Sequence, residues 1–98
     1  MIDDTIKELK AAITKNTSLT EAKRKKLLAL SDELCTELKS MDEGRQKAGV
    51  TIAKKARVAV DKHPEASIAA PHDLIQEFEA SHPNATRILQ QLFAQFGV

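Results

Sequence analysis

The chain has 98 residues and a formal net charge of +1, which suits one domain and argues against a globally basic nucleic-acid binder. One cysteine excludes an internal disulfide framework and a four-cysteine zinc site, and no apolar run approaches the roughly 20 residues of a membrane span. Three glycines and three prolines are too few for the many turns of a β-sandwich or barrel. We therefore expect a single, cytoplasmic, helical domain over residues 1–98, without a cofactor and without a membrane span.

The amino-terminal part predicts an antiparallel helical hairpin over residues 1–42. Apolar residues at steps of three and four place one stripe on a helix near 3–15, namely Ile2, Ile6, Leu9 and Ile13. A second stripe follows a helix near 20–42, capped by Thr20, and comprises Leu27, Leu30, Leu34, Leu38 and Met41. The short polar break between the two helices favours antiparallel neighbours, so we expect the stripes to meet.

The segment 43–62 is expected to form a third, basic helix near residues 44–62. Its stripe consists mostly of small residues, namely Ala48, Ile52, Ala56, Ala59 and Val60. Gly44 and Gly49 each cost such a helix roughly 1 kcal/mol relative to alanine. The sequence leaves open whether this helix is continuous with the second one, and also leaves open the path of residues 43–70.

Residues 63–71 resemble a linker, because two prolines bracket small residues. The carboxy-terminal part, 72–98, predicts two short helices near 72–80 and 84–96, since Pro83 inside one continuous helix would cost about 3 kcal/mol. Ser81 or His82 would cap the last helix, with Pro83 in its first turn. The predicted fold is an all-α, partly coiled-coil-like bundle whose core includes Leu9, Ile13, Leu30, Leu34, Phe78, Ile88, Leu92 and Phe93.

The stretch from Leu74 to Pro83 contains a Phe-Glu-x-x-His-Pro core, formed by Phe78, Glu79, His82 and Pro83. With the amphipathic helix after it, this stretch resembles the carboxy-terminal signature of the domain-of-unknown-function 4404 family of small bacterial proteins. The opening residues and the Leu-Thr-Glu-x-x-Lys turn of the hairpin are also similar to that family. The resemblance implies a helical fold and a bacterial origin but no activity, and we expect the signature to fix a corner between two helices.

The near-zero net charge conceals an uneven distribution along the chain. Residues 1–22 sum to −1, residues 23–62 to +5 and residues 63–98 to −3. The candidate anion-binding set lies in an acid-free stretch and comprises Arg45, Lys47, Lys54, Lys55 and Arg57. A solvated helix face is the favoured interpretation, because no aromatic side chain is interleaved for base stacking. The run from Lys23 to Lys26 spreads around a helical turn, so we interpret it as solubilising.

Chemistry-bearing residues are sparse. His63, His72 and His82 are spaced by nine and ten residues, which matches no compact metal motif. Cys35 adjoins an apolar stripe and is expected to be a half-buried packing residue. We expect no catalytic residue, no metal site and no enzyme, with metal or thiol chemistry at Cys35 and the histidines as a remote alternative.

The sequence therefore favours a non-enzymatic module that self-associates or binds another helical protein. A continuous helix over 20–62 would be about 64 Å long, which the other helices could barely cover. This reasoning predicts a homo-oligomer, preferably a dimer, with a seam at Leu38, Met41, Ala48 and Ile52. The basic segment of one chain would then lie near Glu77 and Glu79 of the other. Nucleic-acid or anionic-surface binding through residues 45–57 is the less favoured alternative.

Overall fold

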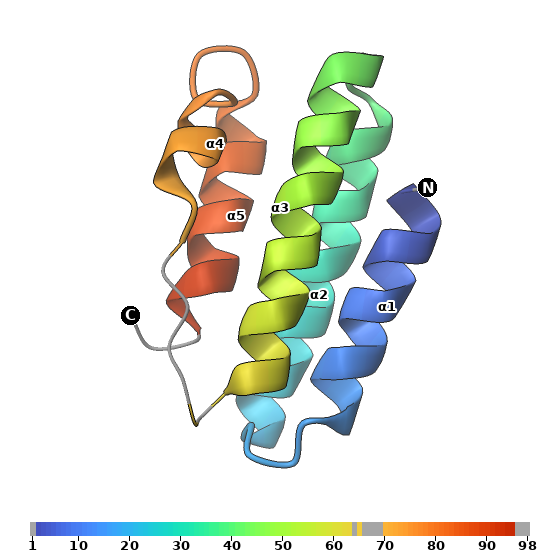
Figure 1. Cartoon of the computed structure of the whole chain (residues 1–98), viewed down its shortest axis with the longest axis vertical. Coiled ribbons are helices and arrows are strands. Elements are labelled where there is room, and N and C mark those ends of the chain that lie inside the picture. The colour runs from blue at the N-terminus through green and yellow to red at the C-terminus, as the bar shows by residue number, and fades with distance from the viewer. Residues whose placement is uncertain (1, 64, 66–69, 96–98) are drawn as a thin grey trace.

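The computed structural model describes residues 2–63, 65 and 70–95, and within these residues it contains α-helices and no β-strand. The first three helices are α1 (Ile2–Lys15), α2 (Glu21–Lys39) and α3 (Glu43–Lys62). They run alternately down and up beside one another, while α4 (His72–Gln76) and α5 (Pro83–Ala94) lie on the side away from α1 (Figure 1). The all-α prediction is confirmed, although α4 ends four residues before its predicted end.

The amino-terminal hairpin is confirmed in its packing and in its cap. Helices α1 and α2 are in contact along their apolar stripes, with Leu9 and Leu34 fully buried. The backbone amide of Lys23 donates to the Thr20 hydroxyl at 3.2 Å, so Thr20 caps α2 as expected. An exposed ion pair between Lys10 and Asp32, at 2.7 Å, also joins the two helices.

The separate helices predicted near 20–42 and 44–62 are confirmed. The continuous helix that the sequence left open does not form, because the chain reverses at residues 40–42. The amides of Ser40 and Met41 bond to the carbonyls of Glu37 and Leu38 at 3.2 and 3.1 Å, which tightens and ends α2. The Asp42 carboxylate then accepts from the Arg45 amide at 2.8 Å and starts α3. The molecule measures 35 × 24 × 19 Å, which accommodates separate helices but no 64 Å helix.

Helix α3 packs mainly against α1 and more lightly against α2. Its buried face is made mostly of small residues, which let backbones approach closely: Gly49, Ala53, Ala56 and Ala59, together with Val50, Ile52 and Val60. Of the predicted stripe, Ala48 is the member that is only half-buried. All eight predicted core residues are buried: Leu9, Ile13, Leu30, Leu34, Phe78, Ile88, Leu92 and Phe93.

The carboxy-terminal pair attaches to the bundle chiefly through α5, which packs against α2. Pro83 is the first residue of α5, where its missing amide costs nothing, as predicted. His82 occupies the capping position, as predicted. Its side chain makes no capping hydrogen bond, so the predicted side-chain cap is wrong. Residues 64 and 66–69 of the predicted linker and the final Phe96 and Gly97 lie outside the described residues.

Candidate partner-binding surfaces

The predicted dimer seam lies inside one chain. Leu38 and Ile52 are fully buried and Met41 is 7% exposed, all within the core of a single molecule. Ala48 is half-buried and packs against that core. The seam prediction is wrong at these residues because it assumed a long second helix, whereas the reversal at residues 40–42 lets α3 cover them. The homo-oligomer itself stays a prediction, but without this interface.

The five predicted anion-binding residues do not form one surface. Arg45 is half-buried, and its guanidinium lies 5.9 Å from the ring centroid of Phe78. Arg57 lies 3.3 Å from a Glu8 carboxylate oxygen on α1 and 3.8 Å from an oxygen of Asp61. Both arginines therefore contact neighbouring elements of the same chain and do not share a surface with the three lysines.

Lys47, Lys54 and Lys55 remain exposed on the side of α3 that faces away from the core. Lys47 has one loose contact, 3.9 Å to Glu43, and in the described part of the chain Lys54 and Lys55 form no ion pair. Thr51 and Val58 lie on the same side. Val58, 45% exposed, is the one large apolar side chain exposed among the described residues. We call these residues, Lys47, Thr51, Lys54, Lys55 and Val58, the outer face of α3.

The Phe-Glu-x-x-His-Pro stretch forms a corner between α4 and α5. Phe78 is fully buried in the same core as Ile88 and Leu92, and the His82 ring lies 6.5 Å from its ring, tilted by 57°. The amide of His82 donates to the Phe78 carbonyl at 2.7 Å, which closes the turn. Glu79 is exposed and forms no ion pair with another described residue. These contacts agree with the structural role predicted for the signature.

Cys35 is half-buried, as expected, and its sulfur lies 3.7 Å from an Asp3 carboxylate oxygen. Burial is the main reason why the pKa of the Cys35 thiol is raised, so the thiol is protonated and weakly nucleophilic at neutral pH. Over residues 2–63, 65 and 70–95, no three metal-binding side chains come together. The three histidines lie at separate places, beside Asn16, Phe93 and Phe78 respectively.

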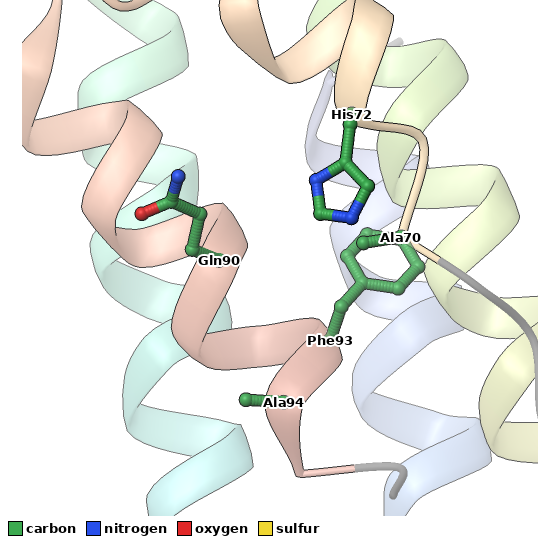
Figure 2. A pocket seen from close by; sticks show the side chains of 5 residues that line it. All are labelled: Ala70, His72, Gln90, Phe93 and Ala94. Atoms are coloured by element: carbon green, nitrogen blue, oxygen red, sulfur yellow. The ribbon is translucent and has the colours of Figure 1, made fainter. Parts of the chain in front are cut away.

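The most apolar hollow of the described surface lies beside His72. It measures about 180 Å³ and lies between the start of α4 and the last turns of α5 (Figure 2). Its lining is mostly apolar: Ala70, His72, Gln90, Phe93 and Ala94. It contains no acid, cysteine or hydroxyl among the described residues, so His72 has no partner there for proton transfer or nucleophilic chemistry.

The sequence did not predict how the ends of α1, α2 and α3 join. The Asn16 side-chain amide donates to the carbonyls of Val60 and His63 at 2.8 and 3.2 Å, which fastens the end of α1 to the end of α3. The Arg24 guanidinium donates to the carbonyls of Asn16 and Leu19 at 2.8 and 3.2 Å, which holds the start of α2 at the same place. The end of α1, the start of α2 and the end of α3, each of which carries basic residues, therefore lie together at the lower end of Figure 1.

Comparisons with protein families, with curated proteins and with solved structures find no match to this chain. The resemblance to the domain-of-unknown-function 4404 family therefore stays a prediction. None of the helices in the described residues is both long and apolar enough to span a bilayer.

Proposed function

We propose that this chain is a non-enzymatic interaction module that binds an acidic helix of a partner protein along the outer face of α3. The observation that carries this proposal is the pair Lys54 and Lys55, which are exposed and form no ion pair with any described residue. Charged side chains that the chain does not pair internally remain able to pair with a partner. A cytoplasmic location and the absence of catalysis belong to the same proposal.

The spacing along the outer face of α3 supports a helical partner. Lys47, Thr51, Lys54 and Val58 follow one another at steps of four, three and four, so they form a single stripe. Helix α3 has 20 residues, which gives the stripe a length of up to about 30 Å. A second helix could lie along it with carboxylates facing the lysines and an apolar residue facing Val58.

Such an interface would be weak and salt-sensitive. Exposed ion pairs contribute at most about 1 kcal/mol each, and one half-exposed valine adds little apolar area. The homo-oligomer is not carried into this proposal, because its predicted seam is buried within one chain. Nucleic-acid binding has less support, because two of its five predicted residues, Arg45 and Arg57, are already engaged.

The test uses a fluorescent helical peptide with glutamates at heptad spacing and a lysine-substituted peptide as its counterpart. We expect the wild-type chain to bind the acidic peptide at low salt and to release it at about 1 M salt, where the screening length is about 3 Å. K47Q/K54Q/K55Q should abolish binding. K23Q/K25Q/K26Q changes the net charge equally at another exposed site and should leave binding intact.

Two results would overturn the proposal. The first is equal loss of peptide binding in both triple variants, since that would reflect net charge rather than the outer face of α3. The second is tighter binding of duplex DNA than of the acidic peptide, with the same dependence on Lys47, Lys54 and Lys55, which would favour a nucleic-acid surface instead.

A further inference from the structure

The end of the bundle where α1 stops, α2 starts and α3 stops is strongly basic. Six basic and three acidic residues fall within 15–26 and 61–65. Arg24 and Asn16 fix the three helix ends together through hydrogen bonds to backbone carbonyls. The lysines around them are exposed: Lys15, Lys23, Lys25, Lys26 and Lys62, which we call the basic end.

Folding stability does not explain the lysines at the start of α2. The amino end of a helix carries a partial positive charge, so cations there oppose the helix dipole and one another. Lys23 lies in the first turn, and Lys25 and Lys26 follow within about 8 Å of the helix start. In the described part of the chain none of the three forms an ion pair. Glu21 is an acid in the same first turn, but in the described residues it forms no ion pair with these lysines. A cluster of cations that opposes its own helix start indicates a functional surface.

The opposite end of the bundle is acidic. Asp3 lies 2.7 Å from Lys39, which places the start of α1 beside the end of α2, and Asn84 lies 2.6 Å from Glu37, which places the start of α5 there too. The exposed acidic residues near these contacts include Asp4, Asp42, Glu43, Glu77 and Glu79, and together with Asp3 and Glu37 they outnumber the basic residues there, Lys39, Arg45 and Lys47. The helix ends that carry these two groups of residues lie at opposite ends of the long axis (Figure 1), so the charge changes sign along that axis.

We propose that the basic end docks the molecule end-on against an anionic phospholipid surface, with the acidic end pointing away. Lysines that spread around a helical turn cannot line a groove on one side of the helix, but all of them lie near a plane across its end. A broad, flat anion such as a lipid leaflet fits this arrangement. The partner and the surface both differ from those proposed for the outer face of α3.

A duplex nucleic acid fits the basic end less well. The described part of this end consists of the loop between α1 and α2 and of helix termini, and none of the described helices projects from it to enter a groove (Figure 1). The described residues at this end include no Phe, Tyr or Trp on which a base could stack.

The test is co-sedimentation with phosphatidylcholine vesicles that contain or lack phosphatidylserine. We expect wild-type protein to bind the phosphatidylserine vesicles at low salt and to leave the neutral vesicles free. K23Q/K25Q/K26Q should weaken binding on the order of 100-fold, from about fivefold per lysine. K47Q/K54Q/K55Q has the same net charge and should bind as wild type. Circular dichroism should show unchanged helicity in both variants, since all six side chains are exposed.

Orientation is tested with a fluorophore quenched by brominated lipid, in a Cys35→Ser background. Ser18 is exposed in the loop at the basic end, and Ser81 is exposed in the turn before α5. A label on Ser18→Cys should be quenched on phosphatidylserine vesicles, and a label on Ser81→Cys should not. Equal quenching at both positions would overturn end-on docking.

Three further outcomes would overturn the proposal. Absence of binding to phosphatidylserine vesicles would do so, as would equal loss of vesicle binding in both triple variants. Tighter binding of duplex DNA than of vesicles, lost with the same three lysines, would assign the basic end to a nucleic acid. None of these outcomes bears on the acidic-peptide experiment, which uses the outer face of α3.

Discussion

Two glycines of α3 that look alike in the sequence have different surroundings. A Cβ added at Gly49 would lie 3.0 Å from Leu38 Cδ1 and 3.1 Å from Leu38 Cγ, and would collide with Cδ2 of the same side chain. Leu38 is fully buried and has little room to move. A Cβ added at Gly44 would meet only a side-chain oxygen of Asp42, at 3.7 Å.

We therefore expect Gly49→Ala to destabilise the fold, although alanine is the better helix former. Overpacking costs about 1–3 kcal/mol and the gain in helix propensity returns about 1 kcal/mol, so the net loss should be up to about 2 kcal/mol. Gly44→Ala is the matched control and should stabilise the fold by up to about 1 kcal/mol. Urea denaturation of both variants measures the difference, and a Gly49→Ala protein stabilised as much as the Gly44→Ala control would contradict the close α2–α3 approach.

Asn16 has a second role besides ending α1. Its amide satisfies two carbonyls at the end of α3, so Asn16→Ala should cost about 1–3 kcal/mol. The last turn of α3 should also lose protection from hydrogen exchange. Asn84→Ala instead removes exposed side-chain contacts to Glu37 and Arg87 and should cost about 0.5 kcal/mol or less. Equal effects of the two substitutions would contradict the fastening role of Asn16.

The Asp3 carboxylate should titrate below its usual range. The hydrogen bond and charge of Lys39 hold its pKa down, and a depressed carboxyl pKa adds stability above the unfolded-state pKa that is lost as pH falls through the folded-state pKa. Lys39→Gln should return the Asp3 pKa toward its ordinary value, as measured by carboxyl NMR titration. An unchanged Asp3 titration in that variant would show that the pair does not form in solution.

Burial was predictable at the residue scale, and side-chain partners were not. Periodicity predicted Leu9, Ile88 and Phe93 correctly, because helix geometry alone decides which residues share a face. The partners of Arg45 and Arg57 depend on which element packs beside α3. Sequence spacing does not reveal that Arg45 lies beside Phe78 or that Arg57 lies beside Glu8.

At the scale of elements, the junction of α2 and α3 depends on one capping carboxylate. Asp42→Ala removes the bond to the Arg45 amide and should cost about 0.5–2 kcal/mol. Glu43→Ala, which removes the neighbouring charge but no cap, should cost about 0.5 kcal/mol or less. Thermal unfolding of the two variants distinguishes them, and similar losses would show that charge near the helix start, rather than capping, is responsible.

The helices were predictable from the sequence to within a few residues, except where short polar residues compete with the backbone. Thr20 and Pro83 are strong local signals, and both mark helix starts in the structure. Ser40 and Asp42 give an equally local signal for a break. The predicted helices near 20–42 and 44–62 place this break within three residues, but continuity stayed open because the apolar stripe extends to Met41, which is buried by the reversed chain rather than by a longer helix.

At the scale of the whole molecule, neither the outer face of α3 nor the basic end could be assigned from the sequence. Summing charge by segment assigns +5 to residues 23–62, although α2 and α3 each run the full length of the bundle. The helix ends that carry Lys15, Lys23 and Lys62 are joined through the hydrogen bonds of Asn16 and Arg24, which sequence spacing does not reveal. A signal was present at Lys23–Lys26, whose charge opposes the start of its own helix, but its spread around a turn led to the solubilising interpretation.

The opposite charges of the two ends give this nearly neutral molecule a large electric dipole moment along its longest dimension. Dipolar molecules attract one another head to tail in dilute salt, and small ions weaken that attraction. We therefore expect salting-in: at neutral pH the solubility of the protein should rise with the first additions of sodium chloride. Static light scattering should show an attraction between molecules that weakens as the salt concentration rises. K23Q/K25Q/K26Q should show a smaller rise, and a wild-type solubility that does not change with salt would contradict the dipole.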